Sequence, residues 1–151
     1  MNVHTVSRPI CIIGLGLIGG SLLRDLHATG HPVFGYNRTT SRAEEAREEG
    51  FDVSSSLTET LARAEKEGAL IVIAVPVPGF PTILDRIANE APSCGFTDVA
   101  SVKSAILTAV KERGLAGRVD FIDGGNLAQL CRASCGMVVN NSSAALSALG
   151  F

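Results

Sequence analysis

Residues 10–21 of the chain read ICIIGLGLIGGS, a short β-branched run followed by a glycine-rich turn. The glycines follow a G-x-G-x-x-G pattern, and apolar residues continue with helical spacing over residues 18–29. In a strand–turn–helix, the first glycine permits the tight turn, the second lets a ligand approach the backbone, and the third lets the helix pack closely. The free N–H groups at the start of the helix suit a diphosphate. The predicted phosphate-binding residues are Gly14, Gly16, Leu17, Ile18 and Gly19.

Strand-like apolar runs alternate with helical patterns over most of the chain. This alternation predicts an α/β fold with a doubly wound parallel sheet, the Rossmann-type NAD(P)-binding domain. Ser56 and Glu59 have capping-box spacing at the start of one helix. The pattern degrades near the end, so we expect the NAD(P)-binding domain over residues 1–125 and a divergent tail over residues 126–151. The expected strands are 10–13, 32–36, 70–75, 96–99 and 119–122, and the expected helices are 18–29, 41–49, 56–67, 80–89 and 101–113.

The residues after the second predicted strand bear on the choice between NADP and NAD. NAD-selective sites usually carry a carboxylate about 20 residues after the glycine turn, where it binds the ribose 2′-hydroxyl. This chain has Asn37 at that position, followed by Arg38 and Thr39. This position therefore has no carboxylate that would repel a 2′-phosphate, and the Arg38 guanidinium can pair with such a phosphate. We therefore expect NADP rather than NAD, the alternative being that Arg38 is a solvated loop residue.

The composition argues against several classes of protein. A formal net charge of −2 offers no basic surface for nucleic acid. No apolar run approaches the roughly 18 to 20 residues that a membrane span needs. Residues 1–9 lack the core of a signal peptide, so the expected location is the cytoplasm. The four cysteines, Cys11, Cys94, Cys131 and Cys135, have too few neighbouring ligands for a metal site and are expected to be free thiols.

Two further stretches of sequence narrow the choice of protein family. Residues 74–77 read AVPV and residues 97–103 read TDVASVK, with an Asp-x-x-Ser-x-Lys pattern. Together with the glycine-rich run, they resemble the prephenate and arogenate dehydrogenases of tyrosine biosynthesis over about residues 8–125. The resemblance implies oxidation of the ring 4-hydroxyl of prephenate or arogenate, hydride transfer to the nicotinamide, and loss of carbon dioxide. It does not choose between the two substrates.

The same resemblance implies roles for individual residues. Val75 and Pro76 border the nicotinamide. Ser101 hydrogen-bonds near the substrate hydroxyl and the family's catalytic histidine, and Lys103 supports the site from the start of the next helix. The position of Ser101 also suits a helix N-cap, so capping alone is the alternative.

The chain departs from the family pattern after the last predicted strand. The family has a Gly-Gly-His-Pro-Met-Ala-Gly-Thr segment, whereas this chain has Asn126 after its two glycines. An asparagine amide forms hydrogen bonds but is no base near neutral pH. The family's dimerising C-terminal helical domain is expected to be missing, since the chain ends at Phe151. We expect a truncated or frameshifted product with impaired catalysis, a poorly ordered tail and a tendency to associate.

Besides a redox-sensing binding module, which no helix-turn-helix or basic patch supports, three alternatives remain. The first is a non-catalytic nucleotide-binding fragment. The second is the N-terminal domain of a hydroxyisobutyrate-type dehydrogenase, which shares the run Asn37-Arg38-Thr39 but differs from this chain over residues 98–103. The third is a glycine-rich turn without any ligand.

Overall fold

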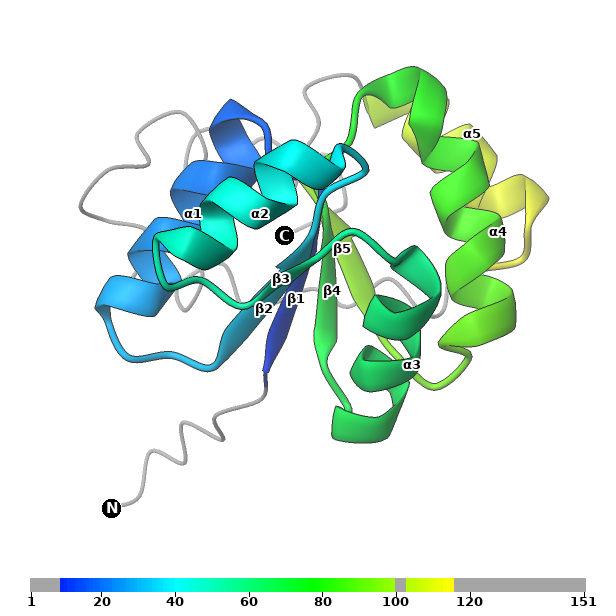
Figure 1. Cartoon of the computed structure of the whole chain (residues 1–151). Helices are drawn as coiled ribbons and strands as arrows, with labels where there is room; N and C mark the ends of the chain where they lie inside the picture. The colour runs from blue at the N-terminus through cyan, green and yellow to red at the C-terminus, as the bar shows by residue number, and fades with distance from the viewer. Residues whose placement is uncertain (1–8, 100–102, 116–151) are drawn as a thin grey trace, which may run out of the picture.

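The computed structural model describes residues 9–99 and 103–115, with the backbone alone for residues 103–107. Its strands form one parallel sheet in the order β3-β2-β1-β4-β5, with helices on both faces (Figure 1). The strands are β1 (Ile10–Ile13), β2 (Val33–Tyr36), β3 (Val53–Ser54), β4 (Leu70–Ile73) and β5 (Phe96–Asp98). The helices are α1 (Leu17–Ala28), α2 (Thr40–Glu48), α3 (Leu57–Glu67), α4 (Phe80–Glu90) and α5 (Lys103–Glu112), with a short 3-10 turn, η1 (Val77–Gly79).

The strand order contains one topological switch. From β1 the chain builds outward through β2 to β3, and then returns to add β4 and β5 on the other side of β1. The helices divide accordingly, with α1 and α2 on one face and α3, α4 and α5 on the other (Figure 1). In open α/β sheets a ligand binds at the carboxyl ends of the strands, next to such a switch. The fold therefore points to the edge between β1 and β4.

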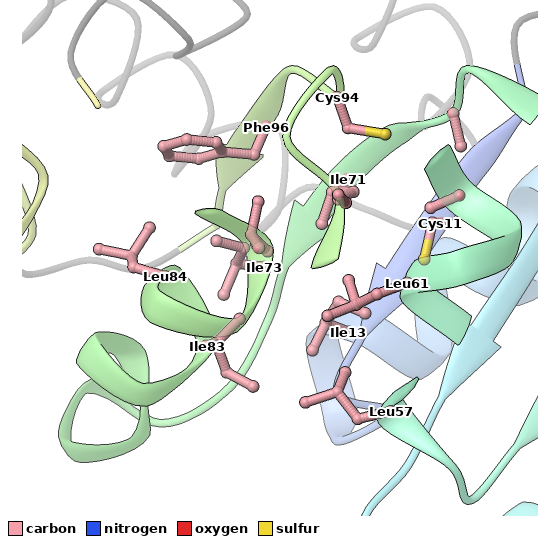
Figure 2. Packing of buried hydrophobic residues seen from close by; sticks show 14 of the residues in the cluster. Cys11, Ile13, Leu57, Leu61, Ile71, Ile73, Ile83, Leu84, Cys94 and Phe96 are labelled. Atoms are coloured by element: carbon pink, nitrogen blue, oxygen red, sulfur yellow. The ribbon is translucent and has the colours of Figure 1, made fainter. Parts of the chain in front are cut away.

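Each face of the sheet carries its own apolar core. On one face, Ile12 and Val72 pack with Leu22 and Leu26 of α1. On the other, Ile13 belongs to the cluster that α3 and α4 cover, and Figure 2 shows Leu57 and Leu61 of α3 beside it. Strands β1 and β4 are buried along their whole length, as expected of central strands covered on both faces.

The predicted doubly wound sheet is confirmed, with two main differences in the strands; β2 and β5 are each one residue shorter than predicted. The two-residue strand β3 was not predicted, because it is too short to show a periodic pattern. The fourth strand ends at Ile73 rather than at Val75. Pro76 has no N–H to donate, and η1 turns the chain away directly after it. The strand predicted at 119–122 and the tail over residues 126–151 lie outside the described residues.

One of the two hydrogen bonds of the predicted capping box of α3 is confirmed. The Ser56 hydroxyl accepts a hydrogen bond from the Glu59 N–H at 3.3 Å. The reciprocal bond of a capping box is replaced, because the Ser56 N–H donates to Ser54 Oγ at 3.0 Å. Within the described residues, no helix is long and apolar enough to cross a membrane.

Two of the four cysteines lie in the described part of the chain. Cys11 and Cys94 are buried in the core between the sheet and α3 and form no disulfide with each other (Figure 2). Desolvation by burial raises the pKa of Cys11 far above its usual value, so the thiol stays protonated and unreactive. The described residues contain no group of metal ligands.

Candidate dinucleotide-binding site

The carboxyl ends of β1, β2 and β4 are joined by backbone hydrogen bonds. The Gly14 N–H donates to the Tyr36 carbonyl at 2.9 Å, and the Ala74 N–H donates to the Ile13 carbonyl at 2.8 Å. The first residues beyond these strands are therefore held in one row. This row contains the predicted glycine turn, the predicted ribose-binding residues and the predicted nicotinamide-bordering residues.

Gly14 is required for two separate reasons. Its φ of +100° lies in the left-handed region that side chains rarely adopt. A Cβ at this position would also stand 2.8 Å from the Ala74 carbonyl oxygen and 3.1 Å from Val75 Cγ1. The predicted role in a tight turn is thus confirmed, and the structure adds the close approach of the segment after β4.

Gly19 lets helix α1 pack directly onto the turn that precedes it. A Cβ on Gly19 would lie 1.9 Å from the Gly14 carbonyl oxygen and 3.1 Å from Ala74 Cβ. The first distance is far below any real Cβ contact, so no side chain fits without moving the helix. The predicted role in close packing is confirmed. Ala74, a small residue that sequence reasoning did not single out for packing, is the neighbour of both glycines.

Gly16 differs from the other two, since no contact with the described residues requires a glycine there. Its φ of −74° is ordinary, and a Cβ would meet no atom within 4 Å. Gly16 is the N-cap of α1 and forms no side-chain cap hydrogen bond. The space in front of the helix start is therefore open, as expected where a ligand approaches the backbone.

The start of α1 presents unpaired donors to this open space. The first turn of a helix leaves its N–H groups without intrahelical partners, and the first helical bond here is from Gly20 to Gly16. Among the described residues, none accepts from the N–H of Leu17, Ile18 or Gly19. The Leu17 side chain is 88% exposed beside them. Donors without a partner in the described residues, at the positive end of a helix, suit an anion.

The ribose-side residues show two kinds of environment. Asn37 is half-buried; its Oδ1 accepts from the Leu15 N–H and its Nδ2 donates to the Thr39 carbonyl, both at 3.3 Å. Arg38 is exposed, and its side chain has no hydrogen bond or ion pair within the described residues. Thr39 is the exposed N-cap of α2, without a side-chain cap bond, and the first turn of α2 carries no acidic residue.

The nicotinamide side is described in part. Val75 is half-buried and Pro76 is exposed, and both follow directly on β4 at the switch point. Ser101 and Asn126 lie outside the described residues. Lys103 begins α5, but its side chain is not among those described. The structure thus brings the residues predicted to bind phosphate, ribose and nicotinamide to one edge of the sheet, whereas the predicted roles of Ser101, Lys103 and Asn126 rest on the sequence alone.

One hollow lies elsewhere, between α3 and the β2–β3 edge of the sheet. Its main polar side chain, Arg63, is already paired with Asp52 and Glu67, both at 2.6 Å, and stacks over the Phe34 ring. Arg63 is therefore not available to bind an anion, and the other charged side chains that line the hollow, Asp52 and Glu59, are carboxylates. The carboxyl edge between β1 and β4, with its unpaired donors, is the better candidate site.

Comparison with known proteins identifies a family and several solved structures to which the chain is similar. The profile of the family described as NADP oxidoreductase, coenzyme F420-dependent, matches residues 9–101. Among curated proteins, none matches the chain. A solved Corynebacterium glutamicum protein, named provisionally as a prephenate dehydrogenase, is 59% identical, with a TM-score of 0.73 over 75% of this chain and 36% of its own.

Two further solved structures share the fold. Arogenate dehydrogenase from Synechocystis is 33% identical, with a TM-score of 0.58 over 69% of this chain and 37% of its own. Prephenate dehydrogenase from A. aeolicus, solved with hydroxyphenyl propionate and NAD⁺, is 22% identical, with a TM-score of 0.60 over 74% and 40%. At that identity the likeness concerns the fold alone. The chain spans little more than a third of the first two relatives' length.

Proposed function

Because the chain belongs to the family described as NADP oxidoreductase, coenzyme F420-dependent, we propose that it binds NADP across the β1–β4 edge and serves prephenate or arogenate oxidation. It carries a dehydrogenase-type NAD(P)-binding domain, and its resemblance to the prephenate and arogenate dehydrogenases is confirmed. The choice of cofactor and of substrate is the proposal.

The main support for the cofactor site is the environment of Gly16. Gly16 has an ordinary backbone conformation and open space where its Cβ would be, in front of the uncapped start of α1. A ligand in this space would account for a glycine at which the described residues leave room for a side chain. The N–H groups of Leu17 and Ile18 fit two oxygens of a diphosphate, since such groups at a helix start bind anions. Val75, at the switch point, is then the neighbour of the nicotinamide end.

The preference for NADP rests on the residues beyond β2. A ribose 2′-phosphate adds about two negative charges, which a carboxylate at the strand end repels and an arginine attracts. The chain has Asn37 instead of a carboxylate, and the Arg38 guanidinium is exposed and without a partner in the described residues. The exposed hydroxyl of Thr39 adds a donor at the same place. These features favour NADP over NAD.

The substrate class rests on relatives rather than on geometry. The 59% identity with the C. glutamicum protein and the 33% identity with arogenate dehydrogenase from Synechocystis support it. When bound, the nicotinamide would accept a hydride from the ring carbon that carries the 4-hydroxyl. The chain's own residues would hold and orient the two reactants. By the resemblance, Ser101 would hydrogen-bond near that hydroxyl, with Lys103 in support.

Asn126 limits what this chain is expected to do with its substrate. It stands where the resemblance places the family's histidine, and an amide takes no proton from a ring hydroxyl near neutral pH. We therefore expect cofactor binding with turnover far below that of a family member that has the histidine.

Calorimetric titration of the chain with NADP and with NAD, alongside rate assays with prephenate and arogenate, tests the proposal. Saturable binding of NADP, tighter than that of NAD, with little or no turnover, is the expected result. Absence of binding for both nucleotides refutes the cofactor site. Equal affinities refute the NADP preference. Turnover at a rate typical of enzymes, with a kcat of roughly 10 per second, refutes the expected effect of Asn126.

A further inference from the structure

The side chain of Asn37 connects two loops that are 22 residues apart in the sequence. Its Oδ1 accepts from the N–H of Leu15, in the middle of the glycine turn, and its Nδ2 donates to the carbonyl of Thr39, at the start of α2. We propose that Asn37 is a positioning residue that fixes the phosphate-binding turn relative to the ribose-binding loop, and that its amide is required for this. The proposal rests on the proposed cofactor site, whose two ends these loops would form.

A second observation shows that β2 supports the turn. Gly35 lies in β2, and a Cβ on it would stand 3.2 Å from the Cδ2 atom of Leu15. The missing side chain at Gly35 therefore leaves room for Leu15 to lie against the strand. Leu15 is thus held by its side chain at Gly35 and by its N–H at Asn37. The Gly14 N–H adds an ordinary backbone bond to the Tyr36 carbonyl. Of these links, the one at Asn37 requires a particular side chain.

The chemistry of the amide explains why asparagine suits this place. An amide offers an acceptor and a donor in one plane, and here each faces a group of the opposite kind. An aspartate would keep an acceptor for the Leu15 N–H, but its second oxygen would face the Thr39 carbonyl, and two acceptors repel. It would also put a negative charge beside Arg38. An alanine would keep neither bond.

These differences separate positioning from selection of the cofactor. The Asn37→Ala variant disturbs the geometry that both nucleotides need, so it should weaken NADPH and NADH by a similar factor of about 5. The Arg38→Ala variant should weaken NADPH alone, because NADH lacks the 2′-phosphate. The Asn37→Asp variant should weaken NADPH more than NADH, since its charge opposes the phosphate. The matched control is Asn89→Ala, on the exposed surface of α4, which should change neither affinity.

A readout without cofactor tests the hydrogen bond itself. Amide hydrogen exchange, followed by NMR on the free protein, reports the Leu15 N–H directly. We expect slow exchange in the wild type and in Asn37→Asp, which keeps the acceptor, and exchange at least about 5-fold faster in Asn37→Ala. Thermal unfolding of each variant shows that it is folded. If Asn37→Ala fails to fold, the wild type and Asn37→Asp still test the bond.

The outcomes distinguish this proposal from the proposed function. Fast exchange of the Leu15 amide in the wild type, or slow exchange that Asn37→Ala leaves unchanged, overturns the bridge. A change in the NADPH-to-NADH affinity ratio in Asn37→Ala as large as that in Arg38→Ala also overturns it, because selection rather than positioning would then be the role. If the wild type binds neither nucleotide, the cofactor site fails, and the Leu15 exchange rates still decide whether the bridge exists.

Discussion

The two loops of the candidate site are constrained in opposite ways. In the glycine turn, Gly14 and Gly19 are dictated by the protein itself, because a Cβ at either position would collide with backbone atoms. In the loop after β2, Arg38 and Thr39 are exposed, and nothing in the described residues restricts the Arg38 guanidinium. The comparison separates residues whose identity the fold requires from residues whose identity is expected to determine which ligand binds. Gly16 belongs with the second group, although it lies in the glycine turn with Gly14 and Gly19.

The largest expected effect is that of Gly19→Ala. Its Cβ would lie 1.9 Å from the Gly14 carbonyl oxygen, so α1 must move away from the turn. We expect a loss of about 3 kcal/mol in the free energy of unfolding, typical of severe overpacking, together with loss of cofactor binding. Urea unfolding and calorimetric titration measure the two effects. Stability equal to that of the wild type would show that the packing of α1 on the turn is not as described.

Gly16→Ala is the matched contrast and should affect binding without affecting the fold. The added Cβ meets no atom of the described residues within 4 Å, so the free energy of unfolding should fall by no more than about 1 kcal/mol, the cost of alanine in place of glycine at a helix N-cap. The same methyl group enters the space assigned to the diphosphate, and both nucleotides should bind roughly 10- to 100-fold more weakly. An unchanged affinity would mean that the open space at Gly16 is not where the ligand lies.

Arg38→Ala should have a smaller and more selective effect. The guanidinium has no partner within the described residues, so its removal should leave the unfolding curve unchanged. Hydrogen bonds to charged groups are worth about 1.5 to 3 kcal/mol, so NADPH affinity should fall roughly 10- to 100-fold while NADH affinity stays constant. Parallel loss of both affinities would assign Arg38 to the building of the site rather than to selection.

The smallest expected effect lies outside both loops, at Glu90 on α4. The hydrogen bond from Arg86 lowers the pKa of Glu90 below its usual value. Because the folded pKa lies below the unfolded value of about 4.3, this pair stabilises the fold above that pH, and the contribution is lost as the pH falls through the folded pKa. Glu90→Gln should therefore cost roughly 0.5 kcal/mol at pH 7, nothing in strong acid, and no cofactor affinity. Unfolding curves at both pH values measure it.

The sequence alone was sufficient to predict the elements that show a periodic apolar pattern and the turn that requires glycine. Alternating patterns placed the helices and all strands but the two-residue β3, and the G-x-G-x-x-G pattern placed the turn. The roles of Gly14 and Gly19 followed from conformation and packing rules that hold for any such turn. Only the three-dimensional arrangement shows that Gly14, after β1, also lies against Ala74, after the neighbouring strand β4.

Asn37 shows where sequence reasoning reaches its limit. Its distance from the glycine turn suggested a residue facing the ribose, and the missing carboxylate suggested NADP. The hydrogen bond to the Leu15 N–H depends on two parallel strands lying side by side, which no local pattern contains. Gly35, inside a predicted strand, was the available signal, since a strand glycine often marks a close approach. The predicted roles of Ser101 and Asn126 remain predictions.

The central claim is that the N–H groups at the start of α1 bind the diphosphate of a nicotinamide nucleotide. A crystal structure of the chain with NADP tests it most directly. Diphosphate oxygens are expected within about 3 Å of the N–H groups of Leu17 and Ile18, in the space beside Gly16. Density for the nucleotide at any other place, or a turn whose N–H groups face away from the diphosphate, would show that these groups do not bind it.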